Sequence, residues 1–291
     1  MARHEEQTLY YVNGSYCKSS EAKISVLDRG FLFGDAIYEV LRVHRGRAFR
    51  LKDHYERMLN GLTSLRISPP FSRAEFDALC AELILRNRVT TGSIYLQVSR
   101  GADATRRHAP TPGLKPTVMG VATPADFPGW KKYGEAVSVI TLADTRWGRC
   151  NLKTTMLLAN TLAKTEAEAA HAFEAIFVAE DGVVREGSST GLFVVLDGTL
   201  RTHPADCRIL PSVTRKLVLE LARADGIPLS ETAVTLTELR RAQEMFLAST
   251  TNDVCPIGTL DGRIVGSGKA GPVTARLMRL VAETLDRESL E

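Results

Sequence analysis

The stretch "TRWGRCNLKTTMLLAN", at residues 145–160, places Lys153 directly before an apolar run. The run has the composition of a buried helix, so we expect a helix from about Lys153 to about His171. Burial, the nearby Arg146 and Arg149, and a helix N-terminus would each lower the pKa of Lys153. A neutral amine is the nucleophile of Schiff-base chemistry, whereas a lysine that merely reaches solvent from a helix start has no such role.

A carboxylate is the second candidate, in "VVREGSSTGLF" at residues 183–193. Glu186 ends an expected strand, and Gly187–Thr190 form an expected turn rich in hydrogen-bond donors. A carboxylate there can pair with a protonated ring nitrogen, which makes a pyridine ring an electron sink. The alternative is a turn carboxylate that accepts from backbone amides.

Phosphate-binding groups are also present. "ILPSVTRKLVLEL", at residues 209–221, places Ser212, Val213 and Thr214 at an expected helix start, where free N–H groups attract anions. Arg57 could add a two-point contact to a phosphate, and Ser249–Thr251 form a second hydroxyl-rich turn. The alternative reading is ordinary helix capping.

A basic loop, "GADATRRHAP" at residues 101–110, carries Arg106 and His108 two residues apart. In an extended loop this spacing points both side chains to the same side, where they could bind a carboxylate. The alternative is a solvated basic loop. The loop also carries an extra basic residue, Arg107.

Composition favours a globular enzyme. The chain has 291 residues, 44% hydrophobic and 24% charged, with a net charge of +3, which does not predict a nucleic-acid surface. No apolar run approaches the ~18 residues of a membrane span, and the charged start does not predict a signal peptide. The five cysteines lack CxxC spacing and the six histidines form no HExxH, so we expect no metal, free thiols and a cytoplasmic location.

Strand and helix patterns alternate along the chain and predict an α+β fold. Tight turns with glycine indicate β-hairpins at residues 13–14, 181–182 and 197–198. Ser72 and Glu75 have the spacing of a capping box at a helix start. We expect a small N-terminal α/β domain at residues 1–122, a proline-containing linker at 123–132 and a large domain at 133–291.

Several motifs, in order, resemble one family over nearly the whole chain. They are "DRGFLFGDAIYEV", "DHYERM", "IYLQVSRG", "RWGRCNLKTTMLLANTLAKTEA", "VVREGSSTGLF", "ILPSVTR" and "FLASTTNDVCPI". Together they resemble the class IV aminotransferases, which use pyridoxal 5'-phosphate (PLP). The resemblance implies a two-domain fold type IV enzyme whose larger C-terminal domain has a strand-rich, barrel-like core. It also implies a homodimer with active sites completed across the interface.

The resemblance implies a role for each candidate residue. Lys153 would form the internal aldimine and carry a proton between the substrate Cα and the cofactor C4′, while Glu186 binds the ring nitrogen. Arg106 and His108, reaching over from the partner subunit, would hold the substrate carboxylate. The other implied cofactor-binding residues are Arg57, Ser188, Ser189, Leu210, Val213, Thr214 and Thr250, and the other implied substrate-binding residues are Tyr38 and Thr251.

Within the family, the chain is similar to the D-amino acid aminotransferases, whose Arg-x-His pair matches Arg106 and His108. The side on which the carboxylate is held decides which face of Cα meets Lys153. This implies ping-pong transfer from a D-amino acid, D-alanine, to a 2-oxo acid, 2-oxoglutarate. The alternatives are a branched-chain L-amino acid aminotransferase, an (R)-amine transaminase, an aminodeoxychorismate lyase, or a non-catalytic binding module with the same fold.

Overall fold

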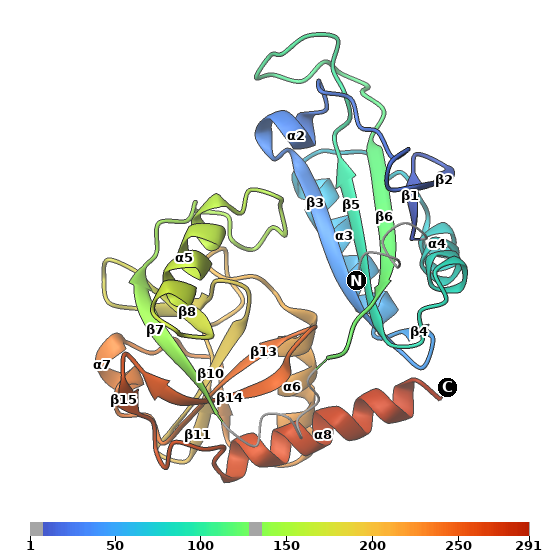
Figure 1. Cartoon of the computed structure of the whole chain (residues 1–291). Coiled ribbons are helices and arrows are strands. Elements are labelled where there is room, and N and C mark those ends of the chain that lie inside the picture. The colour runs from blue at the N-terminus through green and yellow to red at the C-terminus, as the bar shows by residue number, and fades with distance from the viewer. Residues whose placement is uncertain (1–7, 128–135, 291) are drawn as a thin grey trace. The chain divides into compact units, whose positions relative to one another are not determined.

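The computed structural model describes residues 8–127 and 136–290. The chain divides into two compact units (Figure 1). Of the described residues, the first unit contains 8–126, 152–156 and 288–290, and the second contains 127, 136–151 and 157–287. Residues 128–132 of the expected linker lie outside the described residues, so the linker and the domain limits stay predictions.

An antiparallel sheet forms the first unit. Among the described residues it has six strands in the order β2-β1-β6-β5-β3-β4. The expected hairpin at Asn13-Gly14 is confirmed, since both residues have the positive φ angles of a tight turn, 48° and 98°. The strands are β1 (Leu9–Val12), β2 (Ser15–Lys18), β3 (Ala36–His44), β4 (Arg47–Ala48), β5 (Gly92–Ser99) and β6 (Thr117–Pro124).

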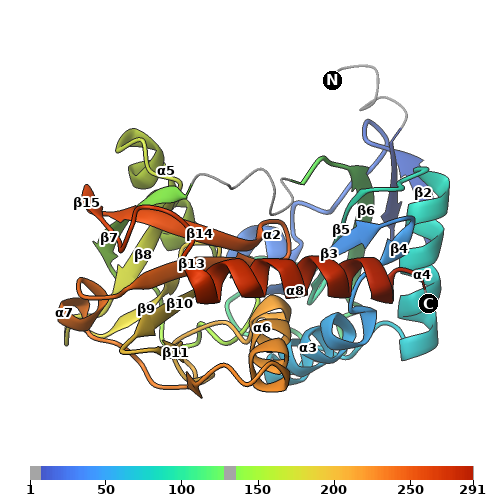
Figure 2. The same cartoon turned by 90° about the horizontal axis from the view of Figure 1, so that it is seen from below.

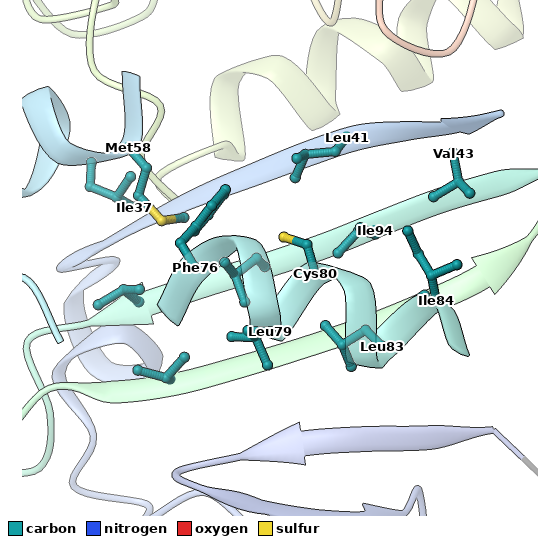
Figure 3. Close-up of a cluster of buried hydrophobic side chains, with 14 of the residues drawn as sticks. Ile37, Leu41, Val43, Met58, Phe76, Leu79, Cys80, Leu83, Ile84 and Ile94 are labelled. Carbon is teal, nitrogen blue, oxygen red and sulfur yellow. The ribbon is translucent and has the colours of Figure 1, made fainter. Parts of the chain in front are cut away.

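Helices α3 (Leu51–Ser64) and α4 (Arg73–Arg86) pack on this sheet, and the short α2 (Arg29–Phe33) precedes β3. The predicted capping box at Ser72 is confirmed. Figure 3 shows the apolar side chains of α4, among them Phe76 and Cys80, gathered over the strands of the sheet. This buried cluster makes β3, which carries the candidate Tyr38, a rigid support.

A mixed sheet forms the second unit, with nine strands among the described residues. Its order is β12-β11-β10-β13-β14-β7-β8-β9, with β15 paired to β14. The elements are β7 (Val137–Ala143), α5 (Leu158–Ala169), β8 (Glu174–Val178), β9 (Val184–Gly187), β10 (Gly191–Leu196), β11 (Thr199–Arg201), α6 (Val213–Ala224), β12 (Leu229–Ser230), α7 (Leu236–Leu239), β13 (Glu244–Ser249), β14 (Asp253–Leu260), β15 (Arg263–Ile264) and α8 (Pro272–Glu288).

This second sheet curls on itself. One buried cluster contains Val184 of β9 and Leu192 of β10, although these strands lie far apart in the sheet order. The same cluster contains Leu247 and Ile257 of the intervening strands β13 and β14. Figure 2 shows these two strands side by side in the second unit. A sheet whose distant strands share one core is curved like a barrel wall, so the predicted α+β class and barrel-like core are confirmed.

Two local expectations are wrong. The pattern "RAQEMFLASTTNDVCPI" at residues 241–257 predicts a helix followed by a strand. The structure has no helix there, because Glu244–Ser249 and Asp253–Leu260 pair as an antiparallel hairpin. Periodicity cannot distinguish a short, fully buried strand from a buried helix. The other error concerns Lys153, since helix α5 begins only at Leu158, a residue that is 74% exposed.

The segment that carries Lys153, residues 152–156, belongs to the first unit. Thr154 forms a β-bridge with Ile37 of β3. The backbone N–H of Tyr38 donates to the carbonyl of Lys153 at 3.0 Å. These interstrand bonds hold the backbone beside β3 in place of a first helical turn. The helix N-terminus therefore does not act on Lys153 as the sequence suggested.

Candidate active site

The amine of Lys153 lies against an aromatic ring. Its Nζ is 4.2 Å from the ring centroid of Tyr38, and the lysine is half-buried. Burial and the neighbouring Glu39 raise the pKa of Tyr38, so its phenol stays protonated. Tyr38 and Lys153 are thus placed together by the pairing of their own backbones, within a single unit.

A buried ion pair lies next along β3. Glu39 is fully buried and accepts from Arg57 Nε at 2.7 Å and from Arg57 Nη2 at 2.6 Å. The ring of His54 lies 2.7 Å from the second oxygen of the same carboxylate. Burial alone would raise the pKa of Glu39, but Arg57 and His54 lower it to about 2. Glu39 therefore stays ionised and orients the guanidinium of Arg57.

Arg106 and His108 meet over one ring. The Arg106 guanidinium carbon lies 5.1 Å from the ring centroid of Phe33, and the His108 ring lies 5.7 Å from it. Both residues are otherwise exposed. Both side chains thus lie beside the same ring, in the same unit as Tyr38 and Lys153. Their binding of a carboxylate stays a prediction.

Glu186 is the central carboxylate of the second unit. It is 6% exposed, and one oxygen accepts from Arg146 Nη1 at 2.7 Å. The backbone N–H of Leu210 lies 3.1 Å from both oxygens. Burial raises the pKa of Glu186 to about 7, against the opposing effects of Arg146 and Leu210. A further cationic donor would stabilise this carboxylate, so the site fits a protonated ring nitrogen.

Arg146 is fixed in turn by Asp144. The two side chains form a fork, with Nε–Oδ1 and Nη2–Oδ2 distances of 3.0 Å. The sequence suggested that Arg146 acts on Lys153, but in the structure it forms ion pairs with Asp144 and Glu186. Its effect is therefore on the carboxylate, where it favours the charged form.

The turn after Glu186 is organised by Glu174, a residue that the sequence analysis missed. This buried carboxylate accepts from the hydroxyl groups of Ser188, Ser189 and Thr190 and from the backbone N–H of Ser189. The hydroxyl protons of Ser188 and Ser189 are therefore directed at Glu174. A cofactor role for these two serines stays a prediction.

The remaining candidates lie at a helix start and a turn. Ser212 caps α6 by accepting from the N–H of Arg215 at 3.2 Å, so the helix starts at Val213 as predicted. Thr214 is the next residue and is buried. Thr250 and Thr251 lie in the turn between β13 and β14. Their cofactor and substrate contacts also stay predictions.

The missed residues had a sequence signal. Glu39 lies in "AIYEVLRV" and Glu174 in "FEAIFV", each a lone carboxylate within an apolar strand. A charged residue on a buried strand requires a partner. The pattern could therefore have marked both as paired carboxylates, although the partners come from distant segments.

Comparison with known proteins gives the family. The model of the family described as amino-transferase class IV matches residues 36–260. The chain belongs to the class IV aminotransferase family. The family predicted from the motifs is thereby confirmed.

Two curated relatives of this class IV aminotransferase are D-alanine aminotransferases. The chain is 38% identical to that of Bacillus licheniformis over 277 residues, which cover 95% of this chain and 97% of the relative. It is 37% identical to that of Staphylococcus aureus (strain MW2) over 280 residues, covering 96% and 99%. The similarity therefore extends over both units.

Among solved structures, the branched-chain amino acid aminotransferase of Escherichia coli is similar to this class IV aminotransferase. The TM-score is 0.87 at 25% identity, covering 95% of this chain and 94% of that one. A branched-chain amino acid aminotransferase from T.th., solved with pyridoxamine 5'-phosphate, has the same TM-score at 30% identity, covering 95% and 93%. The sequence relatives thus carry a D-amino acid in their names, whereas these structural neighbours are named for branched-chain amino acids.

Proposed function

We propose that the protein catalyses PLP-dependent transamination between a D-amino acid, D-alanine, and a 2-oxo acid, 2-oxoglutarate. The observation that carries the proposal is the buried Glu186, whose raised pKa and pairing with Arg146 suit a partner with a protonated ring nitrogen. The curated D-alanine aminotransferases support the choice of substrate.

When bound, PLP supplies a carbonyl carbon that takes up the amino group and a ring that accepts electron density. In this proposal, Glu186 holds the proton of the ring nitrogen and Arg57, oriented by Glu39, binds the phosphate. The N–H groups at the start of α6 suit the same phosphate. Leu210, Val213, Thr214, Thr250, Ser188 and Ser189 complete the proposed cofactor-binding residues.

Lys153 moves the proton at the substrate Cα. An amine serves as both acceptor and donor of a proton only if it alternates between neutral and charged forms, and a half-buried place beside Tyr38 limits its hydration. Lys153 is the catalytic residue of the proposal. Tyr38 and Thr251 bind the substrate.

The handedness of the substrate is assigned to Arg106 and His108. We propose that this pair binds the α-carboxylate, since an arginine and a histidine together supply several donors to a carboxylate. Their common placement at Phe33 supports one joint site. With the carboxylate fixed there, the Cα hydrogen of a D-amino acid faces Lys153.

A substitution of Lys153 tests the mechanism. Lys153→Ala should lose at least about 10³-fold in turnover. The control is Lys164→Ala in the following helix, which should keep near-normal turnover because that amine binds the backbone carbonyl of Phe173. Substantial turnover in Lys153→Ala would contradict the proposal.

A branched-chain L-amino acid aminotransferase is the second candidate, favoured by the structural neighbours. The absorption band of the bound cofactor distinguishes the two. We expect D-alanine, and not L-leucine, to bleach it in the absence of an acceptor. Bleaching by L-leucine alone would establish the second candidate.

We further propose a homodimer in which Arg106 and His108 complete the partner's active site. Each unit exposes large apolar side chains, Val26 and Phe31 in the first and Leu158 and Leu162 in the second. Leu158 and Leu162 are four positions apart on α5, so they lie on one face of the helix, which a second copy of the chain would cover. Association of two copies would bury them.

Mixing two inactive variants tests the shared site. In a mixed dimer of Lys153→Ala and the double variant Arg106→Ala/His108→Ala, one site has both defects and the other has none. Random re-association should then restore about a quarter of the normal sites. If each chain instead supplied Arg106 and His108 to its own active site, every site of a mixed dimer would carry one defect, and no activity would return.

A cytoplasmic location is also proposed. All five cysteines lie in the described part of the chain and are free thiols, as expected in a reducing compartment. Within residues 8–127 and 136–290, none of the helices combines the length and hydropathy needed to cross a membrane.

A further inference from the structure

The loop that carries Arg106 and His108 is held by a buried arginine. Arg29, in α2, is 4% exposed. Its Nη1 donates to the backbone carbonyl of Arg107 at 2.7 Å, and its Nη2 donates to the carbonyl of His108 at 2.6 Å. One guanidinium therefore fixes two consecutive peptide groups of the loop by charge-assisted hydrogen bonds.

The third nitrogen of the Arg29 guanidinium, Nε, is also held by a hydrogen bond. It donates to Asp35 Oδ2 at 3.0 Å, and the same carboxylate forms a fork with Arg100 at 2.7 and 2.9 Å. Burial alone would raise the pKa of Asp35, but the hydrogen bonds from Arg100 and Arg29 lower it. Arg29 is thus held rigidly between an ionised carboxylate and the loop.

The tip of the loop depends on the hydrogen bonds from Arg29, because the hydrogen bonds of Asp103 hold the loop only at its base. There, Asp103 accepts from the N–H and the hydroxyl of Thr111 at 3.0 and 2.8 Å, which closes the loop around residues 104–110. Those seven residues are exposed. Phe33 links the tip to Arg29, since the Arg29 guanidinium carbon lies 4.8 Å from the same ring that Arg106 and His108 approach.

We propose that Arg29 is a positioning residue for the substrate carboxylate: by binding the carbonyls of Arg107 and His108, it holds the Arg106 and His108 side chains in their binding arrangement. The inference rests on the proposed function of that pair. Without Arg29, each substrate molecule would have to order the loop as it binds, so affinity would fall while the chemical step at Lys153 stayed intact.

Hydrogen exchange of the holoenzyme tests the mechanical part. Arg29→Leu should speed amide exchange in peptides covering residues 104–110 at least about tenfold. Arg29→Lys, which lacks the planar fork, should give a smaller increase. The matched control is Arg107→Ala, which removes a loop side chain but keeps the carbonyl that Arg29 binds, and its exchange should match the wild type. Unchanged exchange in Arg29→Leu would overturn the inference.

The half-reaction with D-alanine tests the functional part. In Arg29→Leu, the concentration of D-alanine that gives half-maximal conversion of the bound cofactor should rise at least about tenfold, with the limiting rate within about threefold of normal. For Arg29→Lys, this concentration should lie between the values for the wild type and for Arg29→Leu. A merely structural Arg29 would instead lower the melting temperature with no change in that concentration, which would overturn the proposal.

Parallel measurements on Arg106→Ala and His108→Ala separate the two levels of the proposal. If these variants weaken D-alanine binding and Arg29→Leu does not, the positioning role fails and the proposed carboxylate site stands. If neither Arg106→Ala nor His108→Ala weakens binding, the carboxylate site fails, and the role of Arg29 fails with it.

Discussion

The guanidinium of Arg57 and the carboxylate of Glu39 form a two-point ion pair, with an Nε–Oε1 distance of 2.7 Å and an Nη2–Oε2 distance of 2.6 Å. Glu39 comes from the middle of a strand, and Arg57 from the helix that covers the sheet. The pair therefore joins a rigid support to the residue proposed to bind phosphate.

Arg57→Lys keeps the charge but loses the fork. A lysine cannot reproduce both hydrogen bonds to Glu39, so we expect the affinity for PLP to fall about tenfold to a hundredfold. Titration of the cofactor-free protein with PLP measures the change. Arg47→Lys, an exposed substitution on β4, serves as the control and should bind normally. Equal affinities for the two variants would exclude Arg57 from the phosphate site.

Glu39 also predicts that the unfolding free energy falls at acid pH. Its pKa is about 2 in the folded state and 4.5 in the unfolded chain, so its contribution is complete above pH 4.5 and is lost as the pH falls toward 2. The difference corresponds to about 3 kcal/mol of unfolding free energy. Glu39→Gln should remove this part of the pH dependence in urea unfolding curves. If the unfolding free energies of the variant and the wild type changed with pH in parallel, the assignment of this pH dependence to Glu39 would be contradicted.

Glu186 predicts that the unfolding free energy changes with pH in the opposite direction. Its folded pKa of about 7 lies above the unfolded value of 4.5, so between these pH values the folded cofactor-free protein binds the extra proton. Its unfolding free energy should then decrease as the pH rises from about 4.5 to 7. Bound PLP, by supplying a cationic partner, should reduce this slope. Melting temperatures of the loaded and cofactor-free forms measure it, and Glu186→Gln should abolish the contribution. An unaltered slope in that variant would contradict the role.

Arg107 offers a test of acceptor choice. Its side chain is exposed, while its backbone carbonyl is the group bound by Arg29. If its charge attracts the second carboxylate of a diacid, Arg107→Ala should lower the ratio of kcat/KM for 2-oxoglutarate to that for pyruvate severalfold. An unchanged ratio would remove the hypothesis.

Local chemistry made much of the fold predictable. The turn at Asn13-Gly14 and the capping box at Ser72 are each encoded by a few neighbouring residues, and both are present. The start of α6 at Val213 was predictable for the same reason. Such signals need no knowledge of the tertiary structure.

The error at Lys153 and the omissions arise where distant segments meet. Lys153 was expected at a helix start because nothing near it in sequence reveals its pairing with the backbone of β3. Glu39 was missed because its partners come from α3. Arg29 was missed because it binds backbone carbonyls of a loop far along the chain. Every residue has a backbone carbonyl, so the residue types of the loop do not reveal this contact.

The segment at residues 152–155, which lies against β3, has a consequence for synthesis on the ribosome. The strand β3 is complete once residue 44 has emerged, yet its edge at Ala36–Tyr38 is covered only by a segment more than a hundred positions later. Until then, a nascent chain exposes unpaired strand backbone and lacks the buried side chain of Leu152. Truncated translation products that end near residue 126 should therefore be prone to aggregate through this uncovered edge.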